Sequence, residues 1–287
     1  MTANADLLFE LGTEELPPKA LKTLAQALLS GMCKQLQAAD LAFGETEYFA
    51  TPRRLGLRIH ALAGMQENKA VERRGPALNA AYDKAGNPSK ALLGFAKACA
   101  VEISQLKSIE TPKGAWFVWQ GQQTGESTEK LLPNMLSQAL AELPIPKRMR
   151  WGTHSFQFIR PVHWALLMYN DKIIPGELYG KAFTNQSYGH RFHHPKAVVI
   201  QTADAYVEAL KFANVLVDFS ERKESIRTQV SALAKQVHGQ VEWDEDLLDE
   251  VTALVEWPRA ILGGFEDRFL SVPHEALIAA MKAHQRY

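Results

Sequence analysis

Apolar residues recur with short, regular spacings through the amino-terminal part of the chain. An apolar run at residues 7–11 predicts a strand. Pro17 and Pro18 then open a helix, because proline is tolerated in a first helical turn. Alternation over residues 55–61 predicts a strand with one buried face, and another strand precedes it at residues 47–51. The apolar face of the predicted helix is formed by Leu21, Leu24, Leu28, Met32 and Leu36.

The middle of the chain mixes hairpins with helices. Turn-forming residues divide segments 109–122 and 162–179 into hairpins, the first of them with its turn at residues 111–114. Amphipathic patterns predict helices over residues 87–99 and 128–143. Because hairpins are more prominent than βαβ units, we predict an α+β fold class, with mixed or antiparallel sheets and packed helices.

The pattern changes near residue 195, where helices and acidic residues become more frequent. Predicted beyond it are a helix over 202–213, a buried strand at 214–217, a long helix around 226–237, an acidic helix at 244–256, a strand at 259–265 and a helix over 271–287. The last helix has no Gly, Asn or Pro at its end, so we expect the chain to be a fragment. We therefore divide it into residues 1–195, a hairpin-rich α+β region with a basic–aromatic stretch, and residues 196–287, a helix-rich acidic region.

The net charge of zero conceals an uneven distribution of basic and acidic residues along the chain. Residues 144–196 contain 8 basic and 2 acidic residues, whereas residues 197–287 contain 9 basic and 15 acidic ones. Such asymmetry indicates a charged partner. The acidic run at residues 242–250 is either a solvated face or a docking surface for a basic partner, which could be segment 144–196 itself.

Composition excludes several classes of protein. With 46% hydrophobic and 22% charged residues, the chain is neither disordered nor fibrous. Cys33 and Cys99 lack a C-x-x-C spacing and indicate a reducing compartment. The amino terminus is not a signal peptide, and no apolar stretch is long enough to span a membrane. We therefore expect a cytoplasmic protein without a membrane partner.

Motifs of a self-contained nucleotide-driven enzyme, such as a P-loop or a G-x-G-x-x-G turn, are absent from the sequence. His190, His193 and His194 lie close enough to share a metal ion, but their spacing is not specific, and we favour a surface turn. Glu14 and Glu15 follow the first strand and could act as an acid–base pair. We favour the alternative, in which they stabilise the start of the next helix.

A stretch without acidic residues lies between Glu142 and Asp171. Cations in such a stretch can bind phosphates, and aromatic rings can stack on unpaired bases, although alternating strands would equally place the rings in a core. The candidate RNA-binding residues of this stretch are Lys147, Arg148, Arg150 and Arg160, interleaved with Trp151, Phe156, Phe158 and Trp164. Secondary candidates are Arg53, Arg54, Arg73 and Arg74.

Eight short strings add a more specific signal. They are LLFELGTEELP at residues 7–17, TPRRL at 51–55, KRMRW at 147–151, FIRPVHW at 158–164, GHRF at 189–192, LVEWP at 254–258, FLSVPHE at 269–275 and HQRY at 284–287. In this order they resemble the β subunit of the bacterial heterotetrameric (α2β2) glycyl-tRNA synthetase. The resemblance adds Arg191 to the candidate RNA-binding residues and implies an editing-domain-like fold in the amino-terminal region.

The resemblance implies a part in the reaction that joins glycine to tRNA(Gly) at the expense of ATP. In that family the separate α subunit carries the chemistry and uses ATP and Mg²⁺, so we expect neither a cofactor nor a catalytic residue in this chain. The expected partners are the α subunit and tRNA(Gly), and not DNA. Three hypotheses remain: a tRNA-binding and assembly part of the ligase, an editing-type hydrolase of mischarged tRNA, and a structural scaffold for the α dimer.

Overall fold

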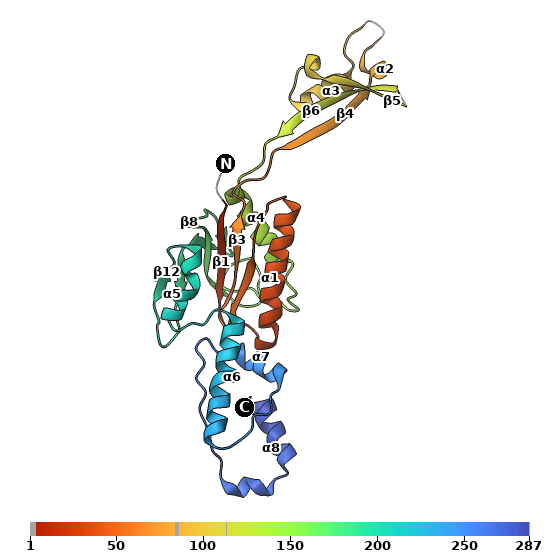
Figure 1. The fold of residues 1–287 in the computed structure, drawn as a ribbon. Coiled ribbons are helices and arrows are strands. Elements are labelled where there is room, and N and C mark those ends of the chain that lie inside the picture. The colour runs from red at the N-terminus through yellow and green to blue at the C-terminus, as the bar shows by residue number, and fades with distance from the viewer. Residues whose placement is uncertain (1–3, 84–85, 113, 287) are drawn as a thin grey trace. The chain divides into compact units, whose positions relative to one another are not determined.

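A computed structural model of the chain describes residues 4–83, 86–112 and 114–286 (Figure 1). The chain forms two compact units: the larger contains the residues up to 64 and those from 128 onwards, and the smaller contains residues 65–127. The boundary expected near residue 195 falls within the larger unit, between two strands that pair with each other, β11 (Gln186–Tyr188) and β12 (Ala197–Val199).

The larger unit is built around a sheet of seven strands among the described residues, in the order β2-β3-β1-β7-β10-β9, with β8 paired to β7. All its strand pairs are antiparallel except β7 with β10. The predicted strands and the second hairpin are thus confirmed, although β8 is shorter than predicted. The strands are β1 (Ala5–Thr13), β2 (Thr46–Thr51), β3 (Arg54–Leu62), β7 (Val162–Tyr169), β8 (Lys172–Ile173), β9 (Glu177–Leu178) and β10 (Lys181–Thr184).

Both faces of the central strand β1 are buried. Leu7, Phe9 and Leu11 belong to a core formed with α1 (Pro18–Ala38) and α4 (Thr128–Ala141), and every apolar position predicted for the first helix is buried in it. Leu8, on the opposite face, joins a second core. A strand covered on both sides needs apolar residues at successive positions, which explains why residues 7–11 are apolar at every position except Glu10.

In the second core, Leu8, Phe49, Leu166 and Met168 of the sheet pack against the segment that follows β10. This segment contains β11, β12, the 3₁₀ turn η2 (Ala203–Ala205) and α5 (Tyr206–Phe212). The strand predicted at residues 214–217 is wrong, although Val215 and Val217 are buried as expected. This extended segment joins no sheet: the Ala50 amide donates to the Val217 carbonyl, and the Leu216 amide donates to the Glu256 carbonyl.

The carboxyl-terminal part contains α6 (Phe219–Gln236), α7 (Glu245–Thr252), the 3₁₀ turn η3 (Asp267–Ser271), α8 (His274–Ala280) and the π-helical turn η4 (Met281–Gln285). The acidic helix is shorter than predicted, and the strand predicted at residues 259–265 is wrong, since this segment has no regular structure. The predicted helical end at Tyr287 lies outside the described residues.

Lysines and arginines of other elements pair with the acidic run at residues 242–250. These cations come from α1, α6 and the last helical segment. Among the described residues none comes from segment 144–196, so the alternative in which that segment docks on the acidic run is not seen within this chain. The pairs are Lys19–Glu250 (3.9 Å), Lys22–Asp249 (2.8 Å), Lys223–Glu245 (2.9 Å), Lys223–Asp249 (2.5 Å), Arg227–Glu245, Lys282–Glu242 (3.8 Å), Lys282–Asp244 (3.7 Å) and Arg286–Glu250 (2.9 Å).

The smaller unit is a three-stranded antiparallel sheet, ordered β4-β6-β5, with short helices. Its hairpin confirms the prediction for residues 109–122, although Lys113 of the predicted turn lies outside the described residues. The Ser89 hydroxyl accepts a hydrogen bond from the Leu92 amide and so caps the predicted helix. The elements are β4 (Lys69–Ala77), α2 (Leu78–Ala81), α3 (Lys90–Cys99), η1 (Ile103–Gln105), β5 (Lys107–Thr111) and β6 (Gly114–Gln123).

Taken by themselves, the two units confirm the predicted α+β class with mixed and antiparallel sheets. Among the described residues, no helix has both the length and the apolar character needed to cross a membrane.

Candidate functional site

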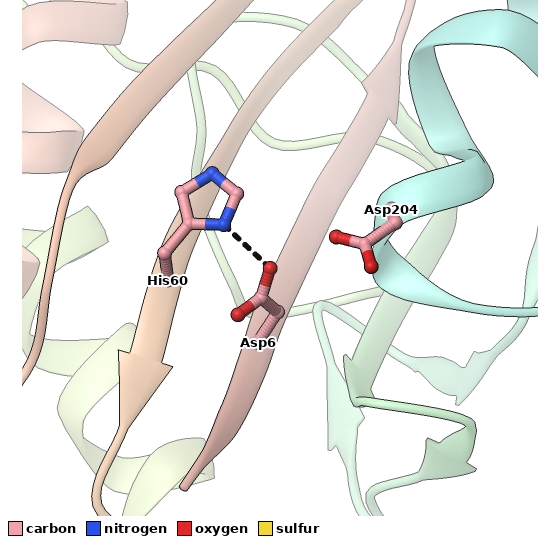
Figure 2. Close-up of side chains that lie close together, drawn as sticks. All are labelled: Asp6, His60 and Asp204. Atoms are coloured by element: carbon pink, nitrogen blue, oxygen red, sulfur yellow. Dashed lines mark hydrogen bonds and ion pairs between the residues drawn. The ribbon is translucent and has the colours of Figure 1, made fainter.

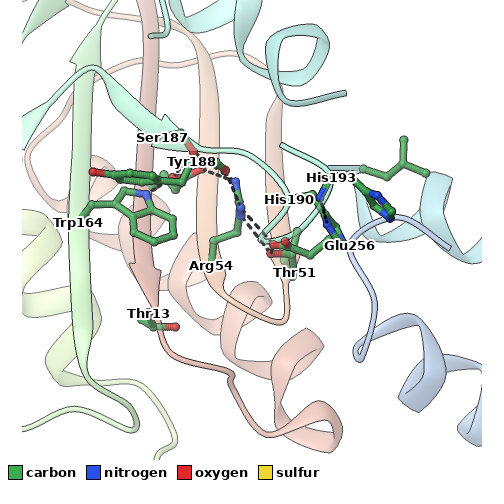
Figure 3. Close-up of polar contacts among 12 residues, drawn as sticks. Thr13, Thr51, Arg54, Trp164, Ser187, Tyr188, His190, His193 and Glu256 are labelled. Carbon is green, nitrogen blue, oxygen red and sulfur yellow. Dashed lines mark hydrogen bonds and ion pairs between the residues drawn. The ribbon is translucent and has the colours of Figure 1, made fainter. Parts of the chain in front are cut away.

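A buried ion network lies at the centre of the larger unit (Figure 3). The Arg54 guanidinium of β3 lies 3.1 Å from a carboxylate oxygen of Glu256 and 3.6 Å from one of Glu10 on β1. Arg54 and Glu10 are completely buried, and Glu256 is 6% exposed. Arg54 also donates to the Thr51 hydroxyl, the Ser187 hydroxyl and the Tyr188 carbonyl. The network therefore ties two strands of the sheet to the segment that follows α7.

Glu10 accepts hydrogen bonds from three side chains besides facing Arg54. They are the Ser187 hydroxyl at 2.6 Å, the Tyr206 hydroxyl at 2.5 Å and the Trp164 indole N–H. Burial raises the pKa of Tyr206 well above its ordinary value, and the neighbouring Glu10 carboxylate raises it further. Tyr206 therefore remains a neutral donor at physiological pH. The Glu10 carboxylate is thus bonded to groups within the larger unit.

This burial overturns the prediction that Arg54 contacts RNA. Burial lowers the pKa of Arg54, but Glu256 and Glu10 more than offset this, so the pKa is raised and the guanidinium stays charged. A phosphate could reach this cation only by displacing two buried carboxylates. Because leaving one partner of such a pair alone costs about 3–5 kcal/mol, Arg54 acts in stability instead.

Above the network, at the end of β1, a loop carries Glu14 and Glu15 to the surface. Glu14 accepts from His163 at 2.9 Å and from Arg191 at 3.1 Å, and Arg191 also lies 3.6 Å from Glu15. Arg160 donates to the Glu15 carbonyl at 2.9 Å. Burial tends to raise the pKa of Glu14, but His163 and Arg191 hold it below its ordinary value, so this carboxylate is ionised.

The expected stabilisation of a helix start by Glu14 and Glu15 is wrong, because neither lies in the first turn of α1 and no side chain caps that helix. The loop instead positions arginines. Arg160 and Arg191 flank Glu15, so residues distant in the sequence meet on one surface.

Arg53 adds a third cation to this region. Its guanidinium lies 5.7 Å from the centre of the Trp164 ring, within the range of a cation–π interaction. Burial lowers the pKa of Arg53, while the Glu256 carboxylate opposes this and Arg191 adds repulsion. The Nε atom of Arg53 is buried and has no hydrogen-bond partner in the structure. We call Arg53, Arg160 and Arg191 the arginine surface.

Gly12 allows the Trp164 ring to lie flat against β1 beneath this surface. A Cβ atom at Gly12 would come within 1.9 Å of Trp164 Cε2, so no larger residue fits without moving the ring. Trp164 is buried and donates to Glu10. The Trp164 ring therefore lies between the buried network and Arg53, and it is too buried to stack on an RNA base.

The other candidates of the basic–aromatic stretch lie in the loop between α4 and β7. Lys147 and Arg150 are exposed, whereas Arg148 donates to the Ala141 and Leu143 carbonyls at the end of α4. A cation at this position stabilises a helix carboxyl terminus. The aromatic residues are packed inward, as the alternative interpretation predicted: Phe158 is fully buried, and Trp151, Phe156 and Tyr179 form a ring cluster.

The three candidate metal-binding histidines lie in the turn before β12. The Nδ1 atom of His190 accepts from the Phe192 and His193 amides, and the His190 and His193 rings stack with their centres 4.5 Å apart. Burial lowers the pKa of His190, and His193, Arg53 and Arg54 lower it further against the pull of Glu256. Within the described residues, these histidines are not among the groups that converge as metal ligands.

One residue of the sequence signals the buried network. Glu10 interrupts an apolar run, and an acid in a fully buried strand requires a partner. Its partners Arg54 and Glu256 lie in the strings TPRRL and LVEWP, far from it in the sequence. No local pattern indicates that these three residues meet, because the contacts join segments that are far apart in the sequence.

Comparison with known proteins identifies the class of the chain. A family described as glycyl-tRNA synthetase beta subunit matches residues 7–287. The glycine–tRNA ligase beta subunit of Marinobacter nauticus is 52% identical over 287 residues, covering 99% of this chain and 41% of that protein. The corresponding subunits of Pseudoalteromonas translucida and Hahella chejuensis are 48% and 50% identical over 98% of this chain.

These matches define a subunit of an aminoacyl-tRNA synthetase. More particularly, the chain belongs to the glycyl-tRNA synthetase beta subunit family, as the sequence strings indicated. The chain spans 41% of the length of these relatives.

Proposed function

We propose that this chain is the tRNA-binding and assembly part of a glycine–tRNA ligase, which forms glycyl-tRNA, AMP and pyrophosphate from glycine, ATP and tRNA(Gly). The chemistry, with ATP and Mg²⁺, belongs to a separate α subunit that this chain binds. Membership of the beta subunit family over residues 7–287 carries the proposal. The beta subunit name of the relatives supports a partner subunit.

The arginine surface is the part of the chain that we assign to tRNA. Arg160 and Arg191 are at least partly exposed and both contact Glu15, and Arg53 retains an unused buried N–H. Guanidinium groups offer paired donors that match the two free oxygens of a phosphate. Lys147 and Arg150 form a second group of exposed cations, which we assign to the same ligand. Arg54 has no part in this contact.

Salt-dependent binding tests this assignment. The affinity of the assembled α–β enzyme for tRNA(Gly) is measured at several salt concentrations, for the unchanged enzyme and for Arg160→Ala and Arg191→Ala. Each lost phosphate contact reduces the slope of log K against log salt by about 0.7–0.9 and weakens binding. Arg268→Ala is the matched control, because Arg268 is 71% exposed and pairs with Glu266 away from this loop.

Unchanged affinity and slope in both variants would refute the assignment of the arginine surface. If an α–β enzyme whose beta subunit lacks residues 1–287 binds tRNA(Gly) equally well, the proposed function itself is refuted. Hydrolysis of mischarged tRNA by this chain alone would favour the editing hypothesis instead.

A further inference from the structure

A second group of polar side chains lies at the opposite end of β1, outside the site described above (Figure 2). Asp6 of β1, His60 of β3 and Asp204 of η2 each offer one ligand atom, and these atoms all lie within 4.8 Å of one another. His60 Nδ1 is 2.5 Å from Asp6 Oδ2. Three elements that are distant in the sequence therefore direct metal-binding side chains to one point.

We propose that Asp6, His60 and Asp204 bind a divalent transition-metal ion, Zn²⁺ or Mn²⁺. One imidazole nitrogen combined with carboxylate oxygens is a ligand set that suits these ions. Ligand atoms at about 2.1 Å from one ion lie up to about 4.2 Å apart, so small side-chain rotations bring the three atoms into a coordination sphere.

Charge supports a cation at this point. Glu47 joins the group through its contact with His60 Nε2 at 3.2 Å, so that three carboxylates surround one imidazole. Among the described residues, Arg58 is the one arginine or lysine within ion-pair distance of these carboxylates, at 2.6 Å from Glu47. Three carboxylates against one guanidinium leave an excess of negative charge, which a divalent cation would offset.

The surroundings of His60 have the arrangement found around metal-bound histidines. One ring nitrogen faces the two aspartates, while the other faces Glu47, which Arg58 holds in place. Such a carboxylate behind a ligating imidazole fixes the ring and raises its basicity. Glu47 therefore occupies the position of a supporting residue, and Nδ1 is the nitrogen that coordinates the ion.

The backbone aims these side chains with a bulge. The pairing of β1 with β3 shifts register between Ala5 and Leu7, and Ala61 has a φ of 49°. Bulges commonly redirect side chains next to functional sites. The Ala61 amide donates to Asp6 Oδ1 at 2.9 Å, which leaves Oδ2 directed at His60.

The element that carries Asp204 is also fixed to β1. The Asn170 amide donates to the Asp6 carbonyl at 2.7 Å, and the Ala203 amide donates to the Asn170 carbonyl at 3.2 Å. A bound ion would therefore link β1, β3 and η2.

Calorimetric titration with ZnCl₂ and, separately, with MnCl₂ tests the proposal on the purified 287-residue chain after treatment with a chelator. We expect one ion per chain, and Mn²⁺ bound there gives an altered electron paramagnetic resonance spectrum. Asp204→Asn and His60→Gln should each weaken binding at least tenfold, and Glu47→Gln by about tenfold. Asp204 is exposed, so its replacement leaves the fold intact, which circular dichroism checks.

His274→Gln is the matched control, because exposed His274 lies 3.3 Å from Glu275 and, within the described part of the chain, pairs with no second acid. Its affinity for the ion should equal that of the unchanged chain. The absence of one-to-one binding for both ions would overturn the proposal. Equal binding by the Asp204→Asn and His60→Gln variants, or equal losses in the His274→Gln control, would overturn it as well.

Discussion

Replacement of Arg54 by methionine probes the buried ion network most directly. Methionine matches the length of the aliphatic part of arginine but removes the charge, so Glu10 and Glu256 remain buried without a cation. Breaking a buried pair in this way costs about 3–5 kcal/mol. Because about 1 kcal/mol shifts the melting temperature of a unit of this size by about 2–4 °C, we expect a decrease of roughly 6–20 °C.

Urea unfolding followed by circular dichroism at neutral pH gives the free energy of unfolding for this comparison. Arg191→Met is the matched control, because Arg191 also pairs with two carboxylates but is 43% exposed. Exposed pairs contribute about 0–1 kcal/mol, so the control should unfold at nearly the same urea concentration as the unchanged chain. If Arg54→Met is no more destabilising than Arg191→Met, the buried network does not hold the larger unit together, and our reasoning about it is refuted.

Two further predictions concern a close contact and an ion pair. Gly12→Ala places a Cβ atom 1.9 Å from Trp164 Cε2, so we expect the unfolding free energy to fall by more than about 1 kcal/mol and the tryptophan fluorescence spectrum to change. Gly263→Ala is the control and should show neither effect, because a Cβ atom at Gly263 meets no neighbour. Burial tends to raise the pKa of Asp249, but Lys22 and Lys223 hold it below the ordinary value of 3.8. A carboxyl group with a lowered pKa in the folded state contributes stability that is present above its unfolded pKa and is lost as the pH falls through the folded value. Asp249→Asn should therefore reduce the stability difference between pH 7 and pH 3 in urea titrations, and an unaltered difference would contradict this account.

Periodicity was sufficient for those elements whose packing has a regular repeat. The helix α1 and the strands β1 and β3 were predicted because each buries a defined set of positions, and the hairpin β5–β6 because its turn residues are distinctive. Residues 214–217 show the limit of this reasoning. Their apolar residues indicated burial correctly, but burial does not require a ladder partner, and their hydrogen bonds go to β2 and to Glu256.

The candidate site could be predicted only in part. Arg191 is exposed and Arg53 and Arg160 are partly exposed, whereas Arg54, the neighbour of Arg53 in the sequence, is completely buried. Arg54 is the first residue of β3, whereas Arg53 belongs to the turn before that strand. Arg54 points inward, where it meets Glu10 and Glu256, and sequence spacing does not reveal that contact.

The chain enters and leaves the smaller unit at neighbouring positions of the larger unit. In the larger unit, Thr128 donates to the Gly64 carbonyl at 3.1 Å and to the Ala63 carbonyl at 2.5 Å. In the smaller unit, Met65 pairs with Ser127 in a β-bridge. The residues flanking the excursion are thus already neighbours, so a tight turn from Gly64 to Thr128 would close the larger unit without it. Residues 65–127 are therefore an inserted domain, which can be deleted or replaced without changing the strand register of the larger sheet.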